Sequence, residues 1–188
     1  MDLVSARLAS HPLCDAAVAG NSLAFGAAYD EYAPLLYGLL LRIVQDAGDA
    51  QEILQETFLA AWNDARKFDA SRGSEIAWLI SMARSRGIDR VRAKRRRGDR
   101  EQEAAREIST ATSDVEDPVA FREIRTAVRF ALQELPEAQR SALELAYFDG
   151  LSQSEIASRL GEPLGTIKTR TNLAMKKLRE RLGAFRNR

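Results

Sequence analysis

Four polar side chains near the C-terminus have the types and spacing needed to contact nucleic acid. Lys168, Thr169, Asn172 and Lys176 recur at short helical intervals, so they share one face of a helix. Lysine neutralises phosphate charge, whereas hydroxyl and amide groups hydrogen-bond to base edges in the major groove. The face is poor in carboxylates, which phosphates would repel. This pattern predicts a DNA-binding face.

Two helices joined by a tight turn must position that face. Ser152 and Glu155 are spaced as a capping box that begins the first helix, and Gly161 and Pro163 end it. The second helix begins near Gly165, and its buried stripe is predicted at spacings of three and four residues: Ile167, Thr171, Ala174, Leu178 and Leu182. The pattern fits a helix-turn-helix whose second helix enters the major groove. Any two-helix hairpin with a solvated cationic face is the alternative.

An acidic stripe is predicted on a helix within residues 46–64. Its carboxylates recur at spacings of three and four residues, with a glutamine beside them and two aromatic residues at the flank: Asp49, Glu52, Glu56, Gln55, Phe58 and Trp62. Charge steers the encounter with a basic partner, and aromatic area holds it. The stripe therefore predicts a docking surface, with an ordinary solvated acidic face as the alternative.

A turn-rich loop, Phe68–Ser74, and a cationic helix follow. The helix is predicted from about Glu75 to Arg97, with an apolar first half and a second half in which cations crowd together. Such crowding destabilises a helix unless a polyanion relieves it, so a phosphate backbone is the expected partner. A solubilising helix end helped by the dipole would explain only one or two of these cations. The stripe expected to face nucleic acid is Ser85, Asp89, Arg92 and Arg96.

The composition limits the possible functions. The chain has 188 residues, 45% hydrophobic and 29% charged, with a net charge of +1, so charge is segregated rather than absent. The single cysteine, Cys14, excludes an internal disulfide and is expected to act as a small apolar side chain. His11 is the only histidine, so the chain has too few histidines for a catalytic or metal site built on them. No apolar run is long enough to span a bilayer, and no signal peptide is evident.

Helical periodicity without strand patterns predicts an all-α protein with two small helical domains on a flexible linker. We expect a partly ordered lead-in over residues 1–20, a first domain over 21–97, a linker over 98–118 and a second domain over 119–188. The helix-turn-helix lies in the second domain.

Three segments together resemble a known family: EILQETFLAAW (52–62), KFDASRGSEIAWLISMARSRGIDRVR (67–92) and LPEAQRSALELAYFDGLSQSEIASRLGEPLGTIKTRTNLAMKKLRERL (135–182). They look like bacterial sigma factors, and the short two-domain layout is similar to the extracytoplasmic-function group of the sigma-70 superfamily. The resemblance covers nearly all of the chain after about residue 21.

The resemblance implies a role for each surface. Core RNA polymerase would bind the acidic helix through Asp49, Glu52, Gln55, Glu56, Phe58 and Trp62. The loop would capture a base flipped from the non-template strand, and the helix after it would contact the minus-ten element: Phe68, Asp69, Ser71, Arg72, Ser85, Arg92 and Arg96. The helix-turn-helix would read the minus-thirty-five element through Lys168, Thr169, Asn172 and Lys176. Family members often have arginine at the position of Leu173 and asparagine at that of Ser85, so those contacts are expected to differ.

The resemblance also implies partners: core RNA polymerase, promoter DNA and an anti-sigma factor, with the protein in the cytoplasm and not inserted in the membrane. No catalytic residue, cofactor, metal or small-molecule substrate is expected. One alternative is a stand-alone helix-turn-helix regulator, which would need a dimer for a palindromic site. A more distant one is an enzyme that uses Glu52 and Glu56 as a metal or acid–base pair.

Overall fold

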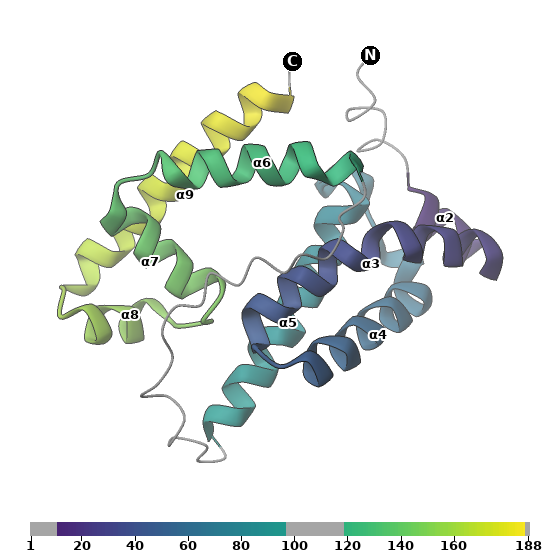
Figure 1. Cartoon of the computed structure of the whole chain (residues 1–188), viewed down its shortest axis with the longest axis horizontal. Coiled ribbons are helices and arrows are strands. Elements are labelled where there is room, and N and C mark those ends of the chain that lie inside the picture. The colour runs from purple at the N-terminus through teal and green to yellow at the C-terminus, as the bar shows by residue number, and fades with distance from the viewer. Residues whose placement is uncertain (1–10, 97–118, 187–188) are drawn as a thin grey trace. The chain divides into compact units, whose positions relative to one another are not determined.

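The structure is a computed structural model that describes residues 11–96 and 119–186, and every element within these ranges is helical. The chain divides into two compact units, Met1–Pro118 and Val119–Arg188, coloured purple to teal and green to yellow in Figure 1. The predicted all-α class with two helical domains is confirmed. The predicted linker, residues 98–118, lies outside the described residues.

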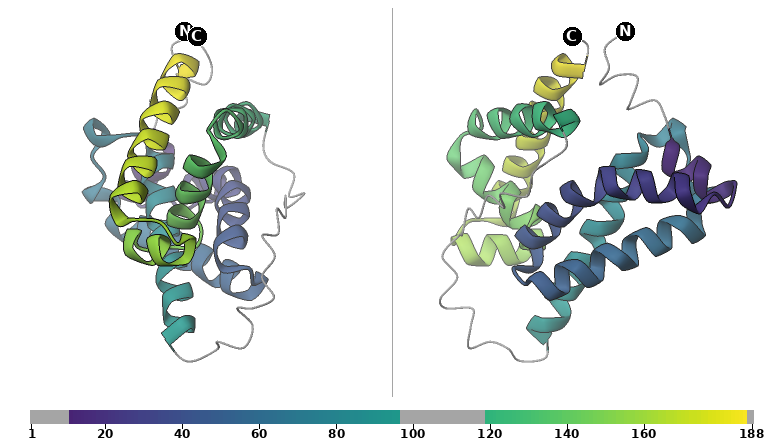
Figure 2. Two further views of the ribbon diagram at one scale, coloured as in Figure 1. Left: turned by 90° about the vertical axis from the view of Figure 1, so that its left-hand side faces the viewer. Right: turned by 45° about the vertical axis from the view of Figure 1, so that its right-hand side comes forward.

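Three long helices and one short helix form unit 1. They are joined by tight turns and two short 3-10 segments: α2 (Pro12–Val18), α3 (Ser22–Val44), α4 (Ala47–Asp64), η1 (Ala65–Lys67), η2 (Ala70–Arg72) and α5 (Glu75–Arg96). Figure 2 shows α3, α4 and α5 side by side, and each contacts the other two. Pro34 lies inside α3, which continues past it to Val44.

The core of unit 1 lies between these helices and is mainly aliphatic. Leu36, Leu40, Ile53 and Leu79 are almost completely buried. Helices α3 and α5 approach closely at Gly87, where an added Cβ would lie 3.1 Å from Cγ2 of Ile43. A methyl group added there would require the Ile43 and Leu40 side chains to shift by a few tenths of an ångström, because interiors are close-packed.

The N-terminal segment belongs to unit 1 to a greater extent than the sequence predicted. Pro12 occupies the first turn of α2, where its missing N–H costs nothing. Leu13, Cys14 and Ala16 are buried, and α2 contacts α3, α4 and η1. The packed unit therefore begins at least as early as α2, before the domain boundary that was expected at residue 21.

Unit 2 consists of four helices: α6 (Val119–Gln133), α7 (Glu137–Tyr147), α8 (Gln153–Leu160) and α9 (Leu164–Arg186). Helix α9 contacts the other three. One cluster contains Leu135, Leu143 and Ala174, and a second contains Leu145, Ile156 and Ile167. The predicted stripe of α9 therefore faces the core, although Thr171 and Leu182 are only half-buried.

The local signals of the helix-turn-helix are confirmed. The Ser152 hydroxyl accepts from the Glu155 amide, and the Ser152 amide donates to the Glu155 carboxylate at 2.7 Å. Gly161 has φ 65°, in the left-handed region that glycine adopts without strain. Helix α9 begins at Leu164, next to the predicted start.

Candidate protein and nucleic-acid interfaces

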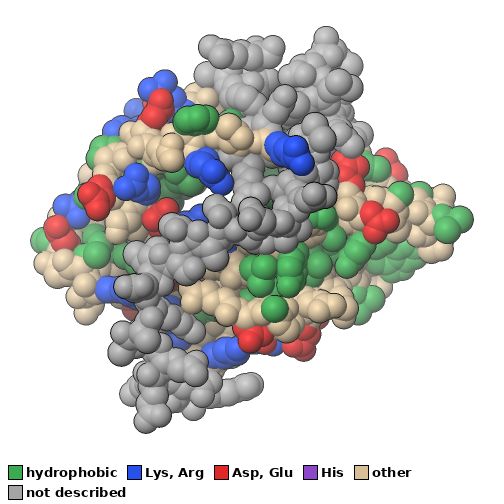
Figure 3. Space-filling view, in the orientation of Figure 1, with side chains coloured by type: hydrophobic (Ala, Val, Ile, Leu, Met, Phe, Trp, Pro, Cys, Tyr) green, Lys and Arg blue, Asp and Glu red, His purple; other side chains and the backbone are tan. Residues whose placement is uncertain are grey.

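One face of α4 is exposed and combines acidic, amide and apolar groups. Glu52, Gln55, Glu56 and Leu59 are all exposed, whereas Ile53 and the rest of the opposite face are buried. Leu59 is 64% exposed and lies one helical turn beyond Gln55. Figure 3 shows that apolar side chains also reach the surface over α3 and α4. The α4 face, defined as these four exposed residues, is suited to binding a protein partner.

The expectation that Phe58 adds aromatic area to this face is wrong. Phe58 is only 3% exposed, and its ring packs against Tyr29 and Phe25 of α3, with centroids 4.5 and 6.3 Å apart. Trp62 is half-buried, and its ring meets the Phe25 ring edge-on at 4.9 Å. These aromatic residues hold α3 to α4, so Leu59 is the large apolar side chain on the face.

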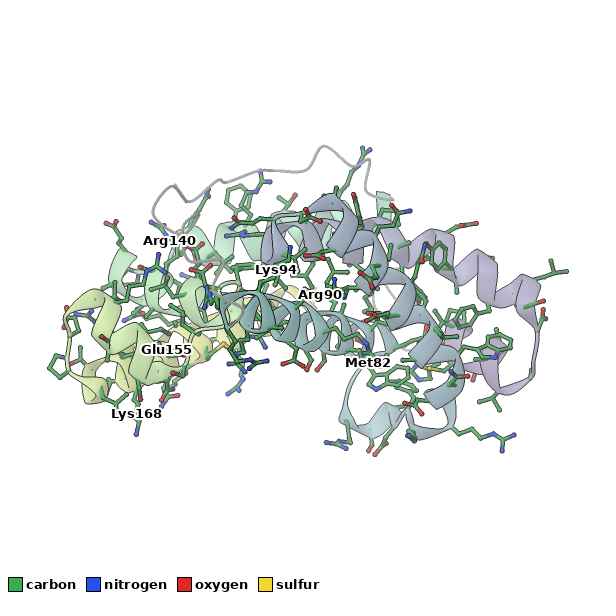
Figure 4. The ribbon with its side chains drawn as sticks, turned by 90° about the horizontal axis from the view of Figure 1, so that it is seen from below. Met82, Arg90, Lys94, Arg140, Glu155 and Lys168 are labelled. Carbon is green, nitrogen blue, oxygen red and sulfur yellow. The ribbon has the colours of Figure 1, made fainter. Side chains whose placement is uncertain are left out.

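Asp49 was predicted to contact the polymerase, but it joins α4 to α5 instead. Its side chain is only 12% exposed; Oδ1 lies 2.6 Å from Nη1 of Arg90, and Oδ2 lies 2.6 Å from Nζ of Lys94. Arg90 also donates to Glu52 at 2.9 Å. Figure 4 labels both cations, one turn apart on α5. Two of the crowded cations are therefore neutralised within the protein, and Glu52 is shared between this cluster and the α4 face.

This cluster leads to a pH-dependent prediction. Burial alone would raise the pKa of the Asp49 carboxyl, but Lys94 and Arg90 outweigh burial and hold that pKa below its ordinary value of 3.8. The stabilisation is therefore complete well above pH 3.8 and is lost as pH falls through the lower folded-state pKa. We expect Asp49→Asn to reduce the free energy of unfolding at pH 7 by about 1–3 kcal/mol.

Urea unfolding of wild type and Asp49→Asn between pH 7 and pH 3 measures this difference, which should shrink below pH 3.8. Asp64→Asn is the matched control, because Asp64 pairs with Lys67 at 2.7 Å on an exposed surface. Exposed pairs contribute little, so this control should unfold like wild type. A difference for Asp49→Asn that does not change with pH would contradict the prediction.

The loop between α4 and α5 has an anchored start and an exposed middle. Phe68 is half-buried, with its ring centroid 4.8 Å from that of His11 and 5.6 Å from that of Trp78. Asp69 accepts from the Ser71 hydroxyl at 2.6 Å and from the Ser71 amide at 2.9 Å, and these bonds lower the pKa of Asp69. Phe68 thus anchors the loop, and the residues accessible to DNA are Asp69, Ser71 and Arg72.

The predicted stripe on α5 is exposed along its whole length. Ser85, Asp89, Arg92 and Arg96 all lie at the surface, spaced by three or four residues over about three turns. This α5 stripe lies on a different side of the helix from Arg90, which turns toward α4. Arg90 and Lys94 therefore pair with acidic groups of α4, whereas Arg92 and Arg96 are exposed to solvent.

The predicted recognition residues of α9 also share one exposed face. Lys168, Thr169, Asn172 and Lys176 are all exposed, and Figure 4 shows Lys168 projecting outward. The Thr169 hydroxyl donates to the Gly165 carbonyl at 2.9 Å, so its oxygen remains an acceptor. We call these four residues the α9 face; phosphates and base edges can both be contacted from such a face.

Sequence reasoning missed Glu75, the buried carboxylate at the start of α5. It is 1% exposed and accepts from the amides of Leu13 and Cys14 and from the Tyr32 hydroxyl. Burial, then hydrogen bonding to Glu75, raises the pKa of the Cys14 thiol, which matches the expected unreactive apolar role. An acidic residue in a first helical turn is common at surfaces, so no local signal indicated burial.

Neither a metal centre nor a membrane span is evident in the described part of the chain. Within residues 11–96 and 119–186, no group of three or more His, Cys, Asp or Glu residues could hold a metal ion. No helix in these ranges is both long and apolar enough to cross a bilayer.

Two family models match the chain, one in each compact unit. The Sigma-70 region 2 model matches residues 28–97, and the Sigma-70, region 4 model matches residues 125–178. The ECF RNA polymerase sigma factor SigK of Mycobacterium ulcerans (strain Agy99) is 39% identical over 166 residues, which are 88% of this chain and 89% of that protein. SigK of Mycobacterium tuberculosis (strain H37Rv) is 35% identical over 180 residues, 95% of this chain and 91% of that protein.

Among solved structures, that of Rhodobacter sphaeroides SigE in complex with the anti-sigma ChrR is 28% identical. The match covers 89% of this chain and 94% of the SigE chain, with a TM-score of 0.44. The family of the chain follows from the two family models and the long matches to SigK proteins. The chain belongs to the extracytoplasmic-function sigma factors of the sigma-70 family and is an alternative sigma factor that directs RNA polymerase to promoters.

Proposed function

We propose that the three exposed surfaces divide the work of initiation among them. The α4 face binds core RNA polymerase, the loop residues 69–72 and the α5 stripe contact the minus-ten element, and the α9 face reads the minus-thirty-five element. The observation that supports this most directly is their separation: acidic and apolar groups are exposed on α4, whereas cations and hydrogen-bonding groups are exposed on α5 and α9.

Each proposed DNA contact follows from the chemistry of its side chain. Lys168 and Lys176 would contact phosphates and set the position of α9, and Asn172 can bond to an adenine edge in the major groove. On α5, Arg92 and Arg96 would follow the backbone of the melted strand. No covalent step is needed, because binding and strand stabilisation account for the whole activity.

We expect the free protein to bind duplex promoter DNA weakly. Its net charge is +1, and Arg90 and Lys94 are already paired with acidic groups. Non-specific affinity depends on the number of phosphates neutralised, and cations that already pair with carboxylates contribute less to it. Core polymerase would supply the remaining affinity and fix the spacing of the two DNA-reading units.

Run-off transcription with purified core polymerase on a promoter library tests this function and its specificity together. The proposal predicts defined start sites only when both proteins are present, and weak footprints with this protein alone. Strong sequence-specific footprints without polymerase would overturn the division of labour. Failure to form any complex with core polymerase would overturn the proposal as a whole.

An anti-sigma factor is the regulator that the family resemblance implies. Such a protein would act by covering the α4 face or the DNA-reading faces until a stress signal releases it. Because polymerase and chromosome are in the bacterial cytoplasm, the protein is proposed to act there. Co-purification from cells before and after stress, followed by identification of the bound protein, tests this regulation.

A further inference from the structure

The loop between α4 and α5 is contacted at both ends by a single element, the start of α2. Phe68 begins this loop, and Glu75 is the first residue after it. His11, immediately before α2, contacts Phe68, and the first two buried residues of α2 bind Glu75. The N-terminal segment therefore contacts the residues on both sides of the exposed part of the loop, although it is far from them in the sequence.

At the first end, the contact is between aromatic rings. The His11 and Phe68 rings meet edge-on, with centroids 4.8 Å apart and an interplanar angle of 62°. Phe68 also packs against Trp78 of α5 at 5.6 Å. Edge-on aromatic pairs have a preferred geometry, so this contact fixes the direction in which the chain enters the loop.

At the second end, the contact is a buried carboxylate with three donors. Glu75 Oε1 accepts from the Cys14 amide at 2.6 Å, and Oε2 accepts from the Leu13 amide at 3.3 Å and from the Tyr32 hydroxyl at 3.1 Å. The His11 side chain forms no capping hydrogen bond to α2, so Glu75 satisfies amides that the segment itself leaves open. A buried carboxylate needs such partners, which holds it in one position.

We propose that His11 and Glu75 are positioning residues for promoter opening, and that α2 acts as a clamp on the minus-ten loop. The clamp fixes Phe68 and Glu75 and therefore the path of residues 69–72 between them. This inference rests on the proposed role of the loop in binding the melted strand. Releasing either end lets the loop move away from the geometry that a flipped base requires, at a cost to opening on the order of 10-fold.

The experiment uses the full chain with core polymerase and five variants, the fifth being Asp69→Ala. His11→Ala removes the ring contact, and His11→Phe restores an aromatic ring at the same place. Glu75→Gln retains the size of the side chain but loses the charged, two-oxygen acceptor. Ile43→Val is the control, because Ile43 is a buried residue of α3 that lies against Gly87, twelve residues along α5 from Glu75, and its truncation lowers stability.

Four quantities are measured for each variant at a temperature where all are folded. The first is the affinity for core polymerase. The second, the minus-ten ratio, compares transcripts from promoters with intact and altered minus-ten elements, and the third is the same ratio for the minus-thirty-five element. The fourth is strand opening, which permanganate reactivity of promoter thymines reports directly. We expect His11→Ala and Glu75→Gln to lower opening and the minus-ten ratio about 10-fold, with the other quantities unchanged. His11→Phe should recover most of the loss.

Asp69→Ala separates failure of the clamp from failure of the proposed loop function. If Asp69→Ala lowers the minus-ten ratio but His11→Ala and Glu75→Gln do not, the clamp is refuted and the loop function stands. If none of the three changes this ratio, the loop function fails and the clamp fails with it. If Ile43→Val gives the same pattern as His11→Ala and Glu75→Gln, or if all four quantities fall together in these variants, the contacts only stabilise the fold and the inference is overturned.

Discussion

Leu59→Asp is expected to reduce the affinity for core polymerase by at least about 30-fold, which corresponds to roughly 2 kcal/mol. Leu59 is 64% exposed in the free protein, with Gln55 and Glu56 one turn before it. A large apolar side chain surrounded by polar groups matches the centre of a protein interface. An aspartate there would lose the apolar contact and would place an unpaired carboxylate where water is excluded.

Titration of fluorescently labelled protein with core polymerase measures this loss. Leu23→Asp is the matched control: it is the same change at a leucine of α3 that is 87% exposed. Neither substitution should alter thermal unfolding much, because both side chains are in water. Equal losses for the two variants would attribute the effect to added negative charge on unit 1 rather than to the α4 face. Unchanged binding by Leu59→Asp would exclude that face as the main contact.

Lys168→Glu should have the second-largest effect, a reduction in minus-thirty-five-dependent transcription on the order of 10- to 100-fold. The substitution replaces a phosphate partner by a group that phosphate repels. The loss should be similar for different minus-thirty-five sequences, since a phosphate contact does not specify bases. Asn172→Ala should instead reduce discrimination between sequences, because an amide reads base edges.

Lys177→Glu is the control for this charge reversal. Nine residues separate Lys177 from Lys168, and at about 100° per residue the two side chains lie on opposite sides of α9. Both are exposed and both variants have the same net charge, so only the face differs. Transcription across a series of salt concentrations provides the measurement, and a shallower salt dependence is expected for Lys168→Glu alone. Equal losses for the two lysines would show a non-specific charge effect.

The fold of unit 2 could be predicted from sequence in some detail. Ser152, Glu155 and Gly161 act on backbone groups within one turn, so their types and spacing are sufficient to place the ends of α8. Ile167 and Ala174 are both buried, as the helical period requires. The same helical period predicts the exposed α9 face, because its residues lie on the side of the helix opposite the buried stripe.

The surfaces of unit 1 were harder to predict because their partners are distant in sequence. Asp49 and Arg90 are 41 residues apart, and nothing near Asp49 indicates that α5 will neutralise it. Phe58 is buried because Phe25 and Tyr29 of α3 pack on it. Periodicity identifies the members of a helix face, but tertiary packing decides which face meets water. Leu59 could have been found as the apolar residue one turn beyond Gln55.

The bond between the Cys14 amide and the Glu75 carboxylate, which spans 61 residues, also sets an order of events on the ribosome. Helix α2 has seven residues, too few to be stable before it packs. It is synthesised before α3, α4 and α5, yet the carboxylate that binds its first amides arrives only with the start of α5. Helix α2 therefore cannot reach its final packing until the chain has been made as far as Glu75.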